Sequence, residues 1–172
     1  MEASYSFVLA QPEHLSELPE IELQAALLFR DWNVPAAVIE ETTPLAEFQA
    51  AQEEGHLWVA LSLQGHPVGF ALTESDGTTL HLEEIDVLPE HGRRGVGKAL
   101  VETICTWARD RGYTAITLTT FRDIPWNAPF YAKLGFEVVL AEALTAQLRR
   151  RVADEEARGL DPVWRVVMQK KL

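Results

Sequence analysis

One segment of the chain places glycine, arginine and lysine where an apolar strand should turn into a helix. It reads Val87-Leu88-Pro89-Glu90-His91-Gly92-Arg93-Arg94-Gly95-Val96-Gly97-Lys98-Ala99-Leu100. Glycines let a backbone approach an anion, the first N–H groups of a helix point at it, and the helix dipole favours negative charge there. Arg93, Arg94 and Lys98 add full positive charges at the same place. The segment therefore predicts a phosphate-binding site.

Two common nucleotide motifs fit this segment poorly. Gly92 to Ala99 reads G-x-x-x-x-G-K-A, whereas a P-loop ends in Ser or Thr, so Ala99 lacks the hydroxyl that would bind magnesium. The G-x-G-x-x-G spacing of a dinucleotide site is absent, because Leu100 stands at its last position. A degenerate P-loop nucleotide binder is therefore kept only as a minor alternative.

The segment resembles the pyrophosphate loop of the GNAT superfamily of acyl-CoA N-acyltransferases, whose pattern is Gln/Arg-x-x-Gly-x-Gly/Ala. In the usual register the first position falls on Gly92, a departure from the family, and Gly95 and Gly97 match. A register shifted by two residues matches instead Arg94, Gly97 and Ala99. The usual register is favoured because the family's Val-x-Pro is present upstream as Val87-Leu88-Pro89.

This resemblance implies a coenzyme A site. The backbone amides from Gly95 to Leu100 would hold the pyrophosphate, and Val87 and Pro89 would flank the strand edge that pairs with the pantetheine arm. The residues of this segment assigned to the cofactor are Val87, Leu88, Pro89, Arg93, Arg94, Gly95, Val96, Gly97, Lys98, Ala99 and Leu100.

A second segment carries the same resemblance independently. Trp126–Phe136 reads W-N-A-P-F-Y-A-K-L-G-F and looks like the family's Asn…Phe-Tyr-x-Lys-Leu-Gly-Phe. The resemblance implies that Asn127 holds the pantetheine amides, that Lys133 belongs to the cofactor site, and that Tyr131 protonates the departing thiolate. The alternative for Tyr131 is that it only anchors the short helix, and Asn127 could be the N-cap of that helix, a role compatible with holding the cofactor.

Length and composition indicate a single soluble domain over residues 1–172. The chain is 47% hydrophobic with five Trp, enough for a core and unlike a disordered sequence. No run is long enough to span a membrane and no secretory signal is evident, so a cytoplasmic protein is expected. The lone Cys105 excludes an internal disulfide and fits a core position, and the histidines show no metal-ligand spacing, so no metal is expected.

Charge is divided unevenly along the chain. Residues 1–92 hold seventeen acidic residues and one basic residue, Arg30, whereas residues 93–172 hold nine acidic and fourteen basic residues. The basic half would meet an anionic cofactor, and the acidic half could steer a cationic substrate. The alternative is that these acids form solvated helix faces. Nucleic-acid binding is not expected, because the net charge of −11 has the wrong sign.

The hydrophobic pattern predicts an α/β (α+β) chain in the order of the GNAT fold. Strands are predicted at residues 5–10, 56–63, 66–74, 81–88, 115–121, 136–140 and 163–169. Helices are predicted at 18–32, 44–54 with Thr43 as N-cap, 96–111, 127–134 and 144–158. The family has a mixed, mostly antiparallel sheet of about seven strands with helices on both faces. Its cofactor strands splay apart around the pantetheine, which here would be the strands at 81–88 and 115–121.

Attack of an amine on a thioester needs a group that takes the amine's proton. In a regular strand, alternation places on one face His81, Glu83, Ile85 and Val87, and on the other Leu82, Glu84 and Asp86. Family members often carry Glu or His four or six residues before the valine, which implies Glu83 or His81. Glu83 is the first candidate base, and Glu84 is the second because a bulge would exchange the faces. Alternatively, these acids are solvated or only bind a cation.

The resemblance also implies an acceptor pocket formed by the first two helices and the loop between them. Phe29, Trp32 and Trp126 are candidate aromatic walls, although Phe29 could instead be a core residue. We expect transfer of acetyl from acetyl-CoA to a primary amine, slightly favouring a small cationic one, by direct transfer in a ternary complex. The alternatives are a protein N-terminal or lysine acetyltransferase and a non-catalytic acyl-CoA-binding module. Family members are often homodimers, and no membrane partner is expected.

Overall fold

The computed structural model describes residues 5–172, which fold as two compact units. The first unit runs through Glu74 and resumes from Glu83 to Thr106, and the second contains Ser75–Leu82 and Trp107–Leu172. The strands follow the order β1-β2-β3-β4-β5-β7-β6 in a seven-stranded sheet. The sheet is mixed, as predicted: β4 and β5 are parallel, whereas β1–β2, β2–β3, β5–β7 and β6–β7 are antiparallel. That the chain is a single domain stays a prediction.

The first unit begins with a strand, a helical layer and two further strands. Its elements are β1 (Ser6–Leu9), η1 (Pro12–Glu17), α1 (Leu18–Ala26), η2 (Leu27–Phe29), α2 (Ala36–Glu40), α3 (Leu45–Glu53), β2 (Leu57–Leu61) and β3 (Pro67–Asp76). Side chains of α1, α3, β2 and β3 share one apolar cluster that includes Ile21, Phe48, Leu57, Val59 and Phe70. Phe48 meets Phe70 edge to face, with ring centroids 5.2 Å apart. This cluster fixes α1 against the strands.

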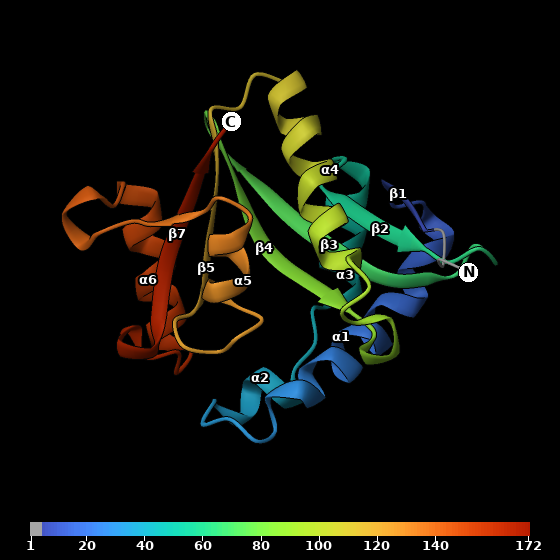
Figure 1. Cartoon of the computed structure of the whole chain (residues 1–172), viewed down its shortest axis with the longest axis horizontal. Helices are drawn as coiled ribbons and strands as arrows, with labels where there is room; N and C mark the ends of the chain where they lie inside the picture. Colours follow the sequence, from blue (N-terminus) through green and yellow to red (C-terminus); the bar gives the residue numbers. More distant parts are fainter. Residues whose placement is uncertain (1–4) are drawn as a thin grey trace. The chain divides into compact units, whose positions relative to one another are not determined.

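β4 and α4 connect through the glycine-rich segment. β4 spans Thr79–Val87, η3 spans Pro89–His91 and α4 spans Val96–Asp110. The buried stripe of α4 includes Val96, Leu100, Ile104 and Cys105, which confirms the predicted core position of the cysteine. Within the first unit, α4 lies in front of β2 and β3, and the teal α3 lies behind them (Figure 1). The helices therefore cover both faces of these strands.

Three details of the helical layer differ from the sequence prediction. The helix predicted to Trp32 ends earlier, because the buried stripe stops at Ala26 and the chain continues as the short η2. Thr43 was predicted to cap the next helix, which is wrong: Pro44 is the N-cap of α3. Thr43 instead donates its N–H and its hydroxyl to the carboxylate of Glu22. The five-residue α2 was not predicted.

The second unit is built on β5 and β7. Its elements are β5 (Ala115–Phe121), α5 (Ala128–Lys133), β6 (Glu137–Val138), η4 (Ala141–Ala143), α6 (Ala146–Ala157), η5 (Pro162–Trp164) and β7 (Arg165–Lys171). β5 pairs along its whole length with β7, and Ala115–Leu118 pair with Thr79–Leu82 of β4. The predicted splay of β4 from β5 stays a prediction. No helix of residues 5–172 is long and apolar enough to cross a membrane.

Candidate active site

The approach to the glycine-rich loop is held in place by contacts within the first unit. The Leu88 N–H donates to the Val68 carbonyl at 2.9 Å, which ties the end of β4 to β3. A Cβ on Gly69 would lie 2.8 Å from the Asp86 carbonyl oxygen, so glycine is needed for this close approach. The Tyr5 hydroxyl and His91 Nδ1 are 2.8 Å apart, which links η3 to the residue before β1. The loop therefore starts from a fixed point.

The loop itself has a backbone suited to an anion. Arg93 has a φ of +57°, and among the described residues it is the one non-glycine with positive φ; Gly95 follows with a φ of +81°. Left-handed residues within a turn direct successive N–H groups into a concave surface. The Ala99 N–H donates to the Gly95 carbonyl at 2.9 Å. The N–H groups of the first helical turn come before this bond in the chain, so the helix itself supplies no acceptor for them. A non-glycine residue kept in this conformation is typical of ligand-binding sites.

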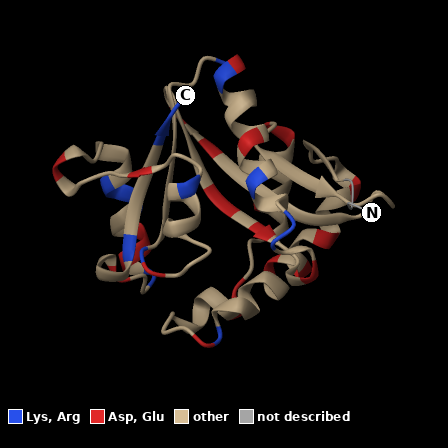
Figure 2. Ribbon diagram, viewed as in Figure 1, with Lys and Arg blue, Asp and Glu red and all other residues tan. Residues whose placement is uncertain are grey.

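Positive side chains accompany this backbone. Arg93, Arg94 and Lys98 are all exposed, and Lys98 makes only a 3.7 Å surface pair with Glu102. Figure 2 shows the blue residues at the turn into α4 and red residues along the second half of β4. The loop thus combines backbone donors, a helix N-terminus and three cations, and these residues fit a pyrophosphate group.

Three carboxylates lie close together beside the strand that leads into the loop. Glu84 and Asp86 come from β4 and Glu22 from α1, and one ligand oxygen of each lies within 4.8 Å of the others. Glu22 is held by Thr43, whose N–H and hydroxyl donate to it at 2.8 Å and 3.0 Å. This carboxylate cluster (Glu22, Glu84, Asp86) could hold a cation, either an ammonium group or a metal ion.

The cluster has an unusual affinity for protons. Burial raises the pKa of Asp86 well above its usual range, and the negative charges of Glu84 and Glu22 and a hydrogen bond with Glu84 raise it further. Burial also raises the pKa of Glu22, which the hydrogen bonds from Thr43 partly oppose and the charge of Glu47 on α3 reinforces. Because like charges this close cannot all ionise easily, the cluster favours binding a proton or a cation.

The second motif lies in the second unit. Tyr131 is 6% exposed and meets the rings of Phe130 and Phe136 edge to face, with centroids 5.1 Å and 5.6 Å away. Asn127 is the N-cap residue of α5; its carbonyl accepts from the Phe130 and Tyr131 N–H groups. The predicted N-cap position of Asn127 is therefore confirmed, although its side chain makes no cap hydrogen bond within the described chain. Lys133 is exposed.

Comparison with models of known protein families identifies the family in which this loop, strand and helix occur together. The model of the acetyltransferase (GNAT) family matches residues 25–136, which include the glycine-rich loop, the carboxylates of β4 and Tyr131. The chain belongs to the GNAT acetyltransferase family. The GNAT resemblance drawn from the two motifs is therefore confirmed.

Three relatives place this GNAT chain among known proteins. The peptidyl-lysine N-acetyltransferase YjaB of Salmonella typhimurium is 33% identical over 85 residues, 49% of this chain and 52% of the relative, so the chain spans about half of that relative's length. The glucosamine 6-phosphate N-acetyltransferase of Trypanosoma brucei brucei is 26% identical over 123 residues, 72% of this chain and 76% of the relative. The PaiA N-acetyltransferase of Thermoplasma acidophilum, crystallised with coenzyme A, has a TM-score of 0.72 at 16% identity over 98% of this chain and 99% of that one. The predicted GNAT fold is thereby confirmed.

The candidate bases of this GNAT chain occupy different environments. Glu83 is exposed, whereas Glu84 contributes to the carboxylate cluster. Sequence reasoning did not choose Asp86 or Glu22. The alternation of β4 already placed Asp86 on the face of Glu84, which was the available signal. Nothing in the local pattern of α1 linked Glu22 to β4.

His81 is the most buried of the candidate bases. It is 3% exposed, and its Nδ1 lies 2.8 Å from the Thr117 hydroxyl of β5. The pKa of His81 is lowered to about 3, mainly by burial and also by the positive charge of Arg151 on α6, whereas the negative charge of Asp76 partly opposes them. The imidazole is therefore neutral near neutral pH. Its assignment as the base stays a prediction.

The buried histidine should make the protein sensitive to mild acid. Its folded pKa is about 3, below the ordinary value of 6.5, so protonation favours the unfolded chain and stability is lost as the pH falls from 6.5 toward 3. We expect His81 alone to lower the free energy of unfolding by about 2 kcal/mol between about pH 7 and pH 5. Urea unfolding of wild type and His81→Gln at both pH values measures the difference. The exposed His66, replaced in His66→Gln, is the control and should leave the loss unchanged.

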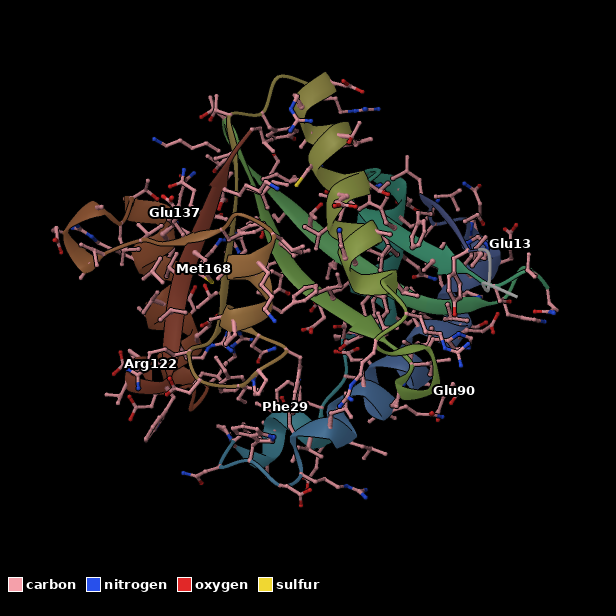
Figure 3. All side chains as sticks on the ribbon, in the orientation of Figure 1. Glu13, Phe29, Glu90, Arg122, Glu137 and Met168 are labelled. Carbon is pink, nitrogen blue, oxygen red and sulfur yellow. The ribbon has the colours of Figure 1, made fainter. Side chains whose placement is uncertain are left out.

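The three candidate acceptor walls divide between the units. Phe29 is partly buried and Trp32 is exposed, both in the first unit just after α1; Trp126 is an exposed loop residue of the second unit. Figure 3 labels Phe29 in the helical segment that precedes α2. Phe29 and Trp32 therefore share one segment, and their role in binding an acceptor stays a prediction.

Proposed function

We propose that this chain transfers the acetyl group of acetyl-CoA to a primary amine, directly, within a ternary complex of enzyme, acetyl-CoA and amine. The observation that carries this proposal is that β4 bears the carboxylate pair Glu84 and Asp86 and leads, through the short η3, into the left-handed, arginine-rich loop before α4. One strand thus joins a group that can take a proton to a group that can hold a phosphate. Coenzyme A in the structure of the PaiA relative supports this choice of acyl donor.

The cofactor is assigned to the loop and the start of α4. The backbone amides from Gly95 to Leu100 hold the pyrophosphate, and Arg93, Arg94 and Lys98 neutralise its charge. Val87, Leu88 and Pro89 offer the strand edge to the pantetheine arm. Asn127 and Lys133 complete the assignment from the second motif. When bound, acetyl-CoA supplies an acyl group activated as a thioester.

The reaction then needs three proton transfers. An alkylammonium with a pKa of about 10 is not nucleophilic, so a carboxylate must take its proton first. Glu84 and Asp86 are proposed to take it, because their pairing keeps a proton affinity above that of an ordinary carboxylate. The free nitrogen attacks the thioester carbon, the new C–N bond forms, and the C–S bond breaks. Tyr131 gives its phenolic proton to the departing sulfur, and the second proton of the attacking nitrogen restores the phenol. Glu83 is kept as the competing base.

The acceptor is proposed to be a cationic amine. The carboxylate cluster offers negative charge to an ammonium group, and residues 1–92 as a whole are strongly acidic. The two relatives named above act, by their names, on peptidyl lysine and on glucosamine 6-phosphate, so the family accepts different amines. A lysine or N-terminal acetyltransferase is the second candidate, and a non-catalytic acyl-CoA-binding module is the third because Gly92 departs from the family pattern.

Acetyl-CoA binding should fail selectively in a loop variant. Gly95 and Gly112 both have a φ of +81° with nothing within 4 Å of an added Cβ, so Gly95→Ala and Gly112→Ala impose similar strain, about 1–2 kcal/mol of unfolding free energy. Only Gly95→Ala should raise the Kd for acetyl-CoA, by about tenfold or more, because distorting the loop loses a hydrogen bond to a charged phosphate. Isothermal titration measures the Kd of all three proteins.

The same preparations test the activity. With acetyl-CoA at about a hundred times its Kd, wild type should gain about 2.7 kcal/mol of stability, whereas ATP with magnesium should add none. Amine-dependent release of free thiol from acetyl-CoA then reports transfer. Stabilisation by ATP alone would contradict the cofactor. Tight binding of acetyl-CoA without thiol release over a broad amine panel would leave the binding module as the function.

A further inference from the structure

An ammonium group needs only negative charge in order to bind, yet the segment after α1 also offers apolar side chains. We propose that the acceptor is an amine with an apolar chain or ring, and that this apolar part packs against Phe29 while its ammonium group lies at the carboxylate cluster. The inference rests on the proposed function and adds the chemical class of the acceptor.

Helix geometry connects the carboxylates to Phe29. Glu22, Ala26 and Phe29 are spaced i, i+4 and i+7 along α1 and η2, so they follow one another on a single helical stripe. Phe29 lies about 12 Å along the axis from Glu22, from a rise of roughly 1.5 Å per residue in an α-helix and 2 Å in a 3₁₀-helix. The intervening Ala26 is small and buried, so no bulky side chain of this stripe stands between the carboxylate and the ring. A molecule held by its ammonium at Glu22 meets this stripe next.

The same segment exposes further apolar surface. Leu27, Leu28 and Trp32 are 41%, 48% and 37% exposed, and the Trp32 N–H donates to the Phe29 carbonyl at 2.9 Å, which folds the chain back after η2. Single exposed leucines are ordinary, but a run of large apolar residues beside charged groups is typical of a binding surface. η2 also contacts α2, beside which Figure 3 shows Phe29. These residues therefore form an ordered apolar surface at the end of the helical layer.

Charge complementarity selects the occupant. Arg30 directly follows Phe29, but the acids Asp31, Glu40 and Glu41 outnumber it, so an acceptor with a carboxylate or phosphate near its amine would be repelled. A short polar amine would satisfy the carboxylates but leave Phe29 in water. An alkyl or arylalkyl amine satisfies both, because its cation meets the cluster and its hydrocarbon covers Phe29.

Two amines of equal length test the proposal. Hexylamine and 2-(2-aminoethoxy)ethanol have the same number of chain atoms, but two oxygens replace carbons in the second. We expect wild type to prefer hexylamine by tenfold or more in kcat/KM, because each buried CH₂ stabilises the complex by about 0.8 kcal/mol, roughly fourfold. Phe29→Ala should lower this preference about tenfold, mainly through the KM for hexylamine. Leu63→Ala, which truncates an exposed leucine in the loop between β2 and β3 and outside this surface, should leave the preference unchanged.

Each result is decisive for the acceptor class. Equal kcat/KM values for the two amines in wild type, or equal effects of the two variants on the preference, would overturn it. Phe29→Gln, of similar length but polar, serves as a second variant if Phe29→Ala does not fold, and it should lower the preference in the same direction. Failure of the proposed function looks different, since neither amine and no other amine of the panel would then release thiol although acetyl-CoA binds.

Discussion

Replacing Asp86 with asparagine should stabilise the protein and disable it at the same time. Burial and the neighbouring charges of Glu84 and Glu22 raise the pKa of Asp86 in the folded state. A raised carboxyl pKa means that stability is full below the unfolded pKa, about 3.9, and is lost as the pH rises through the folded pKa. Asparagine stays neutral, so Asp86→Asn should unfold at a higher temperature than wild type at neutral pH, and this advantage should disappear in acid.

Activity should change in the opposite direction. If the Glu84–Asp86 pair takes the proton of the ammonium, Asp86→Asn should lower kcat/KM for an amine by about a hundredfold or more, within the 10²–10⁴ range of general base catalysis. The kcat/KM of wild type should also rise with pH as the pair in the free enzyme loses its proton, and the variant should lack this ionisation. Thermal melting over pH and thiol-release kinetics measure the two effects on the same samples.

Glu83→Gln is the matched comparison, since it changes the neighbouring acid of the same strand. It should lower kcat/KM less than Asp86→Asn does and should not raise the melting temperature, because Glu83 is exposed. A larger loss in Glu83→Gln would return the role of base to Glu83. A fall in stability of Asp86→Asn would mean that the asparagine amide finds no partner among the carboxylates, and it would contradict the physical account of the cluster.

Local patterns predicted the elements that are held by their own periodicity. α4 was predicted at residues 96–111 and spans Val96–Asp110, because Leu100, Ile104 and Ala108 repeat at helical spacing and face the core. β5 was predicted at its observed bounds, since β-branched residues dominate it. The end of α1 and the role of Thr43 were not predictable in this way. The first depends on where burial against the rest of the fold stops, at Ala26, and the second on the Thr43–Glu22 hydrogen bonds, which join residues far apart in the sequence.

The candidate site was likewise predictable only where its residues act through their own local sequence. The loop was visible because glycine and arginine act through their own backbone and charge, at consecutive positions. The carboxylate cluster was only half visible, because strand alternation pairs Glu84 with Asp86 but says nothing about a third acid on a helix. His81 matched a family position, yet its low pKa follows from burial beside Thr117 and Arg151, which alternation does not reveal. The surroundings of each side chain in the fold therefore distinguish residues that strand alternation alone does not tell apart.

The second large effect is expected at Tyr131, whose hydroxyl is the proposed proton donor to the departing thiolate. Tyr131→Phe keeps the ring and its edge-to-face contacts with Phe130 and Phe136, so the fold of α5 should survive. Without the hydroxyl the thiolate leaves unprotonated, and kcat should fall by about a hundredfold, as is typical of losing a general acid. The Kd for acetyl-CoA should change less than about twofold, because the hydroxyl acts in the transition state and contributes little to ground-state binding.

Tyr113→Phe provides the control for losing a phenolic hydroxyl. The Tyr113 hydroxyl donates to Ser75 Oγ at 3.1 Å on the surface of the second unit, and its ring stacks on Trp107. This variant should keep both kcat and Kd close to the wild-type values. If Tyr131→Phe also keeps its kcat, Tyr131 only anchors α5 and the thiolate takes its proton from water. If Tyr131→Phe loses acetyl-CoA affinity in proportion to activity, the hydroxyl binds the cofactor and is not the acid. Only a loss of kcat at constant Kd supports proton donation, because it is the one result that separates the departure of the thiolate from the binding that precedes it.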